Sequence, residues 1–93
     1  MEDLIATVNH MRSYPGTNGK VGTMGFCLGG KLAYLMATAS DADCNVSYYG
    51  VGIQDALDKA ANIKHPLLMH IAEKDRFVPP EAQETIIKNP LAL

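Results

Sequence analysis

The sequence is poor in the features that mark several common classes of protein. Its 93 residues include only two cysteines and no run of basic side chains. Two cysteines are too few for the disulfide framework of a small secreted domain, so we expect a reducing, cytoplasmic environment. The net charge of −2, from 8 Lys and Arg against 10 Asp and Glu, argues against a nucleic-acid partner.

Long apolar runs are also missing, because the longest contain only a few residues. The first residues, Met1-Glu2-Asp3, carry acid where a secretory signal carries Lys or Arg. We therefore expect neither a signal peptide nor a membrane span, and hence no membrane partner. What remains is the composition of an ordinary globular protein, 47% hydrophobic and 19% charged, with a length that permits one small domain and a marginal core.

Apolar, β-rich segments alternate along the chain with segments of helical periodicity. Strands are expected at 20–26, 44–49 and 66–72, and helices at 3–13, 28–39, 54–62 and 81–88. This alternation predicts an α/β fold in which a three-stranded parallel sheet is flanked by helices. The third strand is almost continuously apolar, so we expect it to be buried on both faces.

The hexapeptide GFCLGG at positions 25–30 lies where the first predicted strand meets a helix. Glycines two positions to either side of one reactive side chain form the nucleophile-elbow pattern, here with Cys27 in the place of serine. The strained turn of such an elbow exposes the nucleophile. The small residues Gly25, Gly29 and Gly30 let neighbouring elements approach the turn closely.

The helix that follows the elbow supplies electrostatic support for this chemistry. Its positive end favours a thiolate at Cys27, and the backbone N–H of Leu28 provides one donor for an oxyanion. The alternative interpretation is that Cys27 is a small buried residue beside a glycine turn. The second cysteine, Cys44, has no elbow and no adjacent base, and we interpret it as a core residue.

Four stretches carry a resemblance to a known family. They are KVGTMGFCLGG at 20–30, YYGVGI at 48–53, the apolar run at 66–72 and EKDRFVPP at 73–80. In this order and spacing they resemble the dienelactone hydrolase family of the α/β-hydrolase superfamily. The resemblance implies that residues 1–93 form a single partial α/β-hydrolase domain, which misses the first strands and the last strand of the fold.

The same resemblance implies a Cys-His-Asp triad, with Cys27 as the nucleophile and Asp75 as the acid that orients the histidine. The separation of these two residues leaves room for two further strands, which brings Asp75 to the same carboxyl edge of the sheet as Cys27. Active sites of open α/β sheets lie at that edge. A second interpretation keeps Asp75 as an ordinary loop residue solvated by Arg76.

No histidine follows Asp75, although the triad order is nucleophile, acid, histidine. His10 falls in the first predicted helix, His65 precedes a proline, and His70 lies in the third predicted strand, pointing at sheet-covering helices. We interpret these histidines as structural or surface residues, with His70 the one that could substitute as the base. The triad histidine is expected outside this chain.

The function implied by the resemblance is hydrolysis of a small lactone or activated ester, such as a dienelactone. No cofactor or metal is expected, because no cluster of Cys, His and acidic residues has ligand spacing. Two alternatives stay open. The chain could be a non-catalytic, truncated or split fragment that folds by associating with itself or a complementing chain through unpaired sheet edges. It could also be a thiol-based sensor that uses Cys27.

Overall fold

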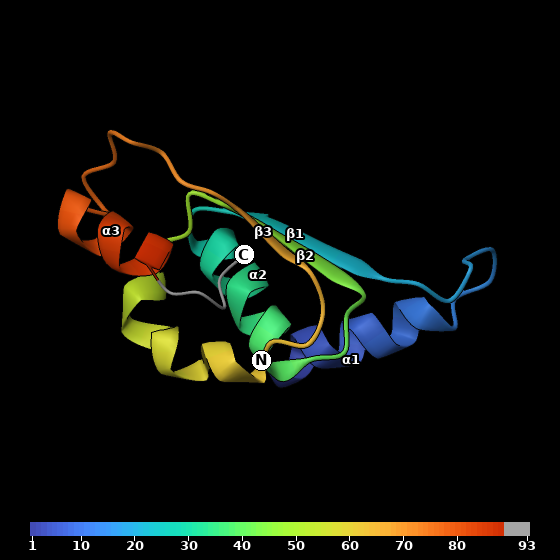
Figure 1. The fold of residues 1–93 in the computed structure, drawn as a ribbon. Coiled ribbons are helices and arrows are strands. Elements are labelled where there is room, and N and C mark those ends of the chain that lie inside the picture. The colour runs from blue at the N-terminus through green and yellow to red at the C-terminus, as the bar shows by residue number, and fades with distance from the viewer. Residues whose placement is uncertain (89–93) are drawn as a thin grey trace.

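The computed structural model describes residues 1–88 of the 93-residue chain (Figure 1). In chain order the elements are α1 (Glu2–Arg12), β1 (Gly22–Phe26), α2 (Leu28–Ala39), β2 (Cys44–Tyr48), the 3₁₀ helix η1 (Ile53–Asn62), β3 (Leu67–His70) and α3 (Pro80–Lys88). The predicted alternation of helices and strands is confirmed, and α2 begins and ends at the residues expected for it. Within residues 1–88, every helix is too short or too polar to span a bilayer.

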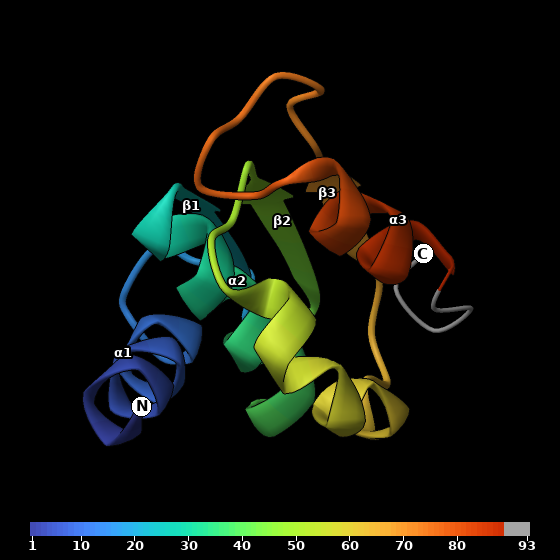
Figure 2. The same ribbon diagram turned by 90° about the vertical axis from the view of Figure 1, so that its left-hand side faces the viewer.

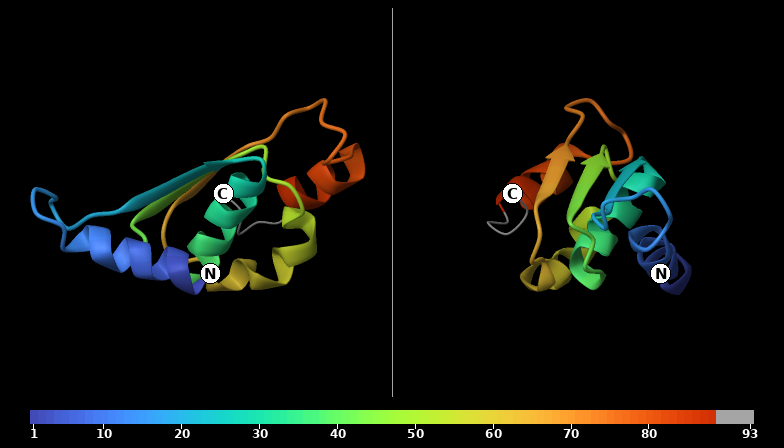
Figure 3. Two further views of the ribbon diagram at one scale, coloured as in Figure 1. Left: turned by 180° about the vertical axis from the view of Figure 1, so that it is seen from behind. Right: turned by 90° about the vertical axis from the view of Figure 1, so that its right-hand side faces the viewer.

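The strands form one parallel three-stranded sheet in the order β1-β2-β3. Each connection leads to the adjacent strand, always on the same side of the previous one. Connections of this kind between parallel strands are right-handed in nearly all proteins. The connecting helices α2 and η1 therefore lie on the same face of the sheet. Figures 1 and 3 show α1 and α3 on that side as well, and Figure 2 shows these two helices on either side of α2.

The core lies between the sheet and these helices. Leu67 of β3, Tyr34 of α2 and Ile53 of η1 are each at most 3% exposed. The Tyr34 hydroxyl donates a hydrogen bond to the carbonyl oxygen of Ala56 at 2.9 Å. Burial raises the pKa of the Tyr34 phenol, and the negative charge of Asp58 raises it further. The hydroxyl therefore stays neutral, and its hydrogen bond links α2 to η1.

The opposite face of the sheet carries no helix in the described part of the chain. We call this surface the open face; the alternation of side chains along the strands assigns to it Met24, Phe26, Cys44, Val46, Tyr48, Leu68 and His70. On it, Met24 is 63% and Leu68 is 56% exposed. The prediction that the third strand is buried on both faces is therefore wrong, because every described helix packs against the other face.

Two further expectations fail on the open face for the same reason. Cys44, predicted to be a core residue, is exposed, because it begins β2 on the side without helices. His70 does not point at sheet-covering helices; its ring stacks on that of Tyr48, with centroids 4.4 Å apart. Tyr48 stacks in turn on Phe26 at 4.9 Å. These residues are neighbours in the strand register, so the end of the sheet carries a row of stacked rings.

Arg12, at the end of α1, ties this helix to the loops that enter β1 and β2. Its guanidinium donates to the carbonyl oxygen of Gly19 at 2.8 Å and to a carboxylate oxygen of Asp43 at 3.0 Å. The same Asp43 oxygen accepts a hydrogen bond from the Val21 N–H at 2.7 Å. The Val21 N–H, followed by Arg12, lowers the pKa of Asp43 below its ordinary value. The ionised carboxylate therefore stabilises the fold.

The lowered pKa of Asp43 predicts a loss of stability in acid. Because the folded pKa lies below the unfolded value near 3.8, the stabilisation is complete above that value and is lost as the pH falls through the folded pKa. Thermal unfolding between about pH 2.5 and 7, followed by circular dichroism, should show a smaller acid-induced fall in Tm for Asp43→Asn than for the wild type. Asp41→Asn is the control, because the Asp41 side chain is 72% exposed and reaches Arg12 only at 3.4 Å. Identical acid profiles for Asp43→Asn and the wild type would contradict the prediction.

Candidate active site

Cys27 is the single residue between β1 and α2. Its backbone angles, φ 57° and ψ −115°, lie in a region that is strained for a residue with a Cβ atom. Cys27 is exposed, which excludes the alternative of a buried structural cysteine. The turn therefore holds a free thiol in solvent at the N-terminus of α2.

The strained backbone of Cys27 is held from both sides. Its N–H donates to the carbonyl oxygen of Tyr48 at 3.0 Å. Its carbonyl oxygen accepts hydrogen bonds from the N–H of Lys31 at 3.2 Å and the N–H of Val51 at 3.3 Å. Two of these partners belong to the end of β2 and the loop that follows it, so the elbow is locked by the neighbouring strand as well as by its own helix.

The glycines of the elbow differ in how much the structure needs them. A Cβ atom on Gly25 would overlap the backbone carbonyl of Gly29. A Cβ atom on Gly30 would lie 2.6 Å from the Tyr48 carbonyl oxygen and 2.8 Å from the Cα of Gly50. At Gly29 the same atom would meet nothing within 4 Å. Close approach therefore requires glycine at 25 and 30, whereas position 29 has room for a side chain.

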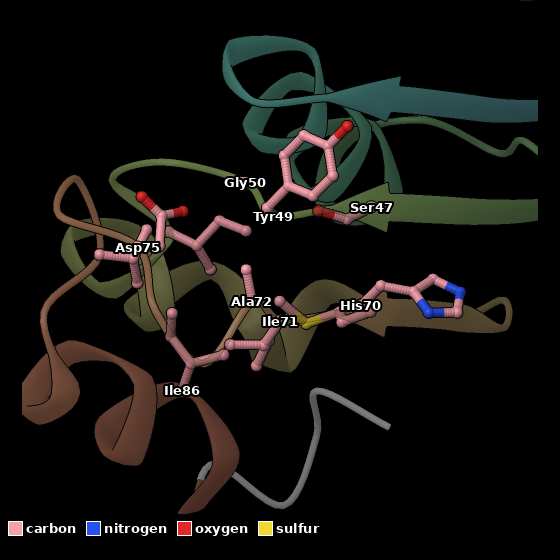
Figure 4. A pocket seen from close by; sticks show the side chains of 11 residues that line it. Ser47, Tyr49, Gly50, His70, Ile71, Ala72, Asp75 and Ile86 are labelled. Carbon is pink, nitrogen blue, oxygen red and sulfur yellow. The ribbon is translucent and has the colours of Figure 1, made fainter.

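Asp75 lies in the loop that follows β3, at the same end of the sheet as the elbow (Figure 1). It is half-buried, and one of its carboxylate oxygens accepts a hydrogen bond from the Phe77 N–H at 2.9 Å. Asp75, Tyr49 and Gly50 line a small cavity, which Figure 4 shows from close by. Arg76 makes no ion pair with Asp75 among the described residues; its guanidinium lies over the Phe77 ring, 5.1 Å from the centroid.

The carboxyl ends of the strands thus bring together Cys27 after β1, Tyr49 and Gly50 after β2, and Asp75 after β3. The cavity beside Asp75 is not lined by Cys27. The expected nucleophile and the expected acid therefore lie at the same end of the sheet, with the loop after β2 between them.

The histidines do not complete this arrangement within residues 1–88. The imidazole of His70 points away from Asp75 (Figure 4), and His10 and His65 are exposed at other places. None of these side chains is hydrogen-bonded to Cys27 or Asp75 in the described part of the chain. The same residues contain no group of three or more His, Cys, Asp or Glu side chains placed to hold a metal ion.

Segment 47–51 borders the elbow although its sequence contains no nucleophile or base motif. Ser47 is buried and donates its hydroxyl to the Gly30 carbonyl oxygen at 2.8 Å. Tyr49 has a positive φ of 38°, and its N–H donates to the His70 carbonyl oxygen at 2.7 Å. The strand register was the available signal, because in a parallel sheet the residues after β2 must lie beside those after β1.

The contrast between Gly25 and Gly29 yields a paired prediction. Gly25→Ala should lower the free energy of unfolding by about 2 kcal/mol or more, because its Cβ atom overlaps backbone that cannot move independently. Gly29→Ala should be neutral or stabilising by up to about 1 kcal/mol, because alanine favours the helix and meets open space. Urea unfolding of both variants measures the difference. Equal stability of the two variants would contradict the close packing of the elbow.

A model of the dienelactone hydrolase family matches residues 1–91 of the chain. The carboxymethylenebutenolidase of Pseudomonas putida is 44% identical over 93 positions, which cover 96% of this chain and 39% of that protein. The putative carboxymethylenebutenolidase of Azospirillum brasilense is 60% identical over 60 positions, 64% of this chain and 26% of that protein. The carboxymethylenebutenolidase homolog of Mus musculus is 40% identical over 68 positions, 72% of this chain and 27% of that protein. The chain spans about two fifths or less of the length of these curated relatives. The match over nearly all of its length means that the chain belongs to the dienelactone hydrolase family.

Proposed function

We propose that this chain supplies the nucleophile and the acid of a hydrolase that cleaves small lactones or activated esters. Cys27 is the nucleophile, Asp75 is the acid, and residues 1–93 form a single partial α/β-hydrolase domain. The observation that carries the proposal is the exposed Cys27 on a strained turn at the N-terminus of α2. Two free thiols favour a cytoplasmic setting for this chemistry.

In the proposed reaction the Cys27 thiolate attacks the acyl carbon, and a carbon–sulfur bond forms. The Leu28 N–H at the start of α2 stabilises the resulting oxyanion. The carbon–oxygen bond of the lactone then breaks, and the ring oxygen leaves as an enolate. Water attacks the thioester and releases the acid and the thiol. A thiolate expels poor leaving groups badly, so an enol lactone suits it better than an amide, in keeping with the name carboxymethylenebutenolidase given to the relatives.

The catalytic base of this reaction is assigned to a histidine outside residues 1–93. Residues 76–93 contain no histidine, and His70 points away from Asp75. The carboxylate of Asp75 is fixed by the Phe77 N–H, which leaves it oxygen lone pairs to orient an imidazole. In this reading the chain holds two members of the triad, and turnover requires the third.

Replacement of Cys27 tests the proposed function. In the full-length protein, Cys27→Ala should reduce kcat for hydrolysis of a dienelactone by about 10³-fold or more, because the substitution removes the thiol on the elbow that is proposed to form the thioester. Cys44→Ala is the matched control, since Cys44 is also an exposed thiol but lies on the open face away from the elbow. Hydrolysis followed by loss of substrate absorbance separates the two variants. Full activity of Cys27→Ala would end the proposal.

A second candidate function is non-catalytic self-association, and the open face is the observation that favours it. The open face bears no Asp, Glu, Lys or Arg, and it exposes Met24, Phe26 and Leu68 by half or more. A face without charge is complementary to a second copy of itself, and face-to-face packing of two sheets buries such surfaces. The outer edges of β1 and β3, unpaired among the described strands, add a second route to pairing with another chain.

Self-association through the open face predicts a site-specific effect of charge. Leu68→Lys should shift the sedimentation of the chain toward the monomer, because it places an ammonium within the surface that self-association would bury. Ile87→Lys is the control, since Ile87 is an exposed apolar residue of similar exposure, 65%, on α3. Sedimentation velocity at several concentrations measures both variants. A monomeric wild type, or equal effects of the two substitutions, would rule out this interface.

A further inference from the structure

Ser47 is a buried hydroxyl that the proposed reaction does not use. It lies in β2, is 1% exposed, and donates a hydrogen bond to the Gly30 carbonyl oxygen at 2.8 Å. Gly30 belongs to the first turn of α2, directly after the elbow. The bond therefore joins the sheet to the helix end on which Cys27 depends.

This end of α2 has little support of its own. The helix begins Leu28-Gly29-Gly30, and glycine is among the weakest helix-forming residues, at a cost of about 1 kcal/mol each relative to alanine. Its N-cap is Cys27, which makes no side-chain capping hydrogen bond. At Gly30 glycine cannot be exchanged for a better helix former, because a Cβ atom would collide with Tyr48 and Gly50. Contacts from outside the helix therefore add to the support that the helix's own hydrogen bonds give this turn.

The external ties to this turn come from the end of β2 and its loop. The Tyr48 carbonyl and the Val51 N–H bind the backbone of Cys27, and these groups are present whatever the side chains are. Ser47 adds a hydrogen bond from its side chain to the Gly30 carbonyl oxygen, which a substitution can remove. Because Ser47 is 1% exposed, its hydrogen bond lies in a low-dielectric environment, where it is electrostatically stronger than in water.

We propose that Ser47 is a positioning residue whose hydroxyl, bonded to the Gly30 carbonyl oxygen, fixes the first turn of α2 and with it the Leu28 N–H beside Cys27. This inference rests on the proposed role of Cys27 as nucleophile. The proposal predicts that loss of this hydroxyl slows acylation of Cys27 but not its alkylation. Acyl transfer to the sulfur creates an oxyanion that needs the Leu28 N–H, whereas alkylation of the sulfur does not.

The test compares these two reactions on the same thiol. Cys44→Ser, carried in every variant, leaves Cys27 as the one cysteine. With p-nitrophenyl acetate a sulfur–acyl bond forms, the ester carbon–oxygen bond breaks, p-nitrophenolate leaves with the bonding electrons, and the thiol proton goes to solvent. With iodoacetamide the sulfur displaces iodide and no oxyanion forms. Ser47→Ala should slow acylation by about 3- to 10-fold, the range expected for one net hydrogen bond, while alkylation changes by less than about 2-fold.

Matched variants separate positioning from general stability. Ser40→Ala makes the same substitution at the other end of α2, where Ser40 donates to the Met36 carbonyl oxygen at 2.7 Å, and it should leave both rates unchanged. Ser47→Thr keeps the hydroxyl and should restore acylation. Equal slowing of both reactions by Ser47→Ala, no slowing of either, failure of Ser47→Thr to restore acylation, or loss of the folded circular dichroism spectrum in Ser47→Ala would each overturn the proposal. A parent protein that is acylated no faster than glutathione would instead count against Cys27 as the nucleophile.

Discussion

The strained backbone of Cys27 is the constraint on which the rest of the site depends. A residue in this region of φ and ψ costs about 1–3 kcal/mol, and it persists only where its surroundings compensate. Here the compensation comes from the Tyr48 carbonyl and the Val51 N–H, which require α2 to lie directly against the loop after β2. That approach leaves no space for a Cβ atom at Gly30, and the turn itself leaves none at Gly25, where the Gly29 carbonyl lies. The elbow is contiguous in the sequence, yet it cannot form without β2.

The same packing explains why one face of the sheet is covered and the other is open. The strands follow each other in one direction, β1-β2-β3, so right-handed connections place α2 and η1 on a single face. Covering the open face by such a connection would require the chain to reverse its direction across the sheet, which these strands do not do. The stacked rings of Phe26, Tyr48 and His70 consequently lie on the outside, although parallel sheets are normally buried on both faces.

The elements and the elbow could be predicted from the sequence because their signals are local. The spacing of apolar residues predicted where α2 begins and ends, and the glycine pattern predicted that Cys27 lies on a turn. The burial of β3, Cys44 and His70 could not be predicted, because an apolar strand has the same sequence whether its second face meets a helix or solvent. The hydrogen bond from Ser47 to Gly30 could not be predicted for a related reason, since the two residues are neighbours only through the packing of α2 on β2.

The distribution of contacts also separates two properties of the site. The groups that hold Cys27 lie between residues 25 and 51, so the conformation of Cys27 is a property of two adjacent strands and one helix. The environment of Asp75 is different, because its loop turns back on itself through Phe77 and Val78 and meets no histidine among the described residues. Acylation of a thiolate needs only the first set of groups, whereas release of the product by water also needs a base. In the proposed reaction, thioester formation therefore draws on groups within these strands, and hydrolysis of the thioester needs the histidine that Asp75 is proposed to orient.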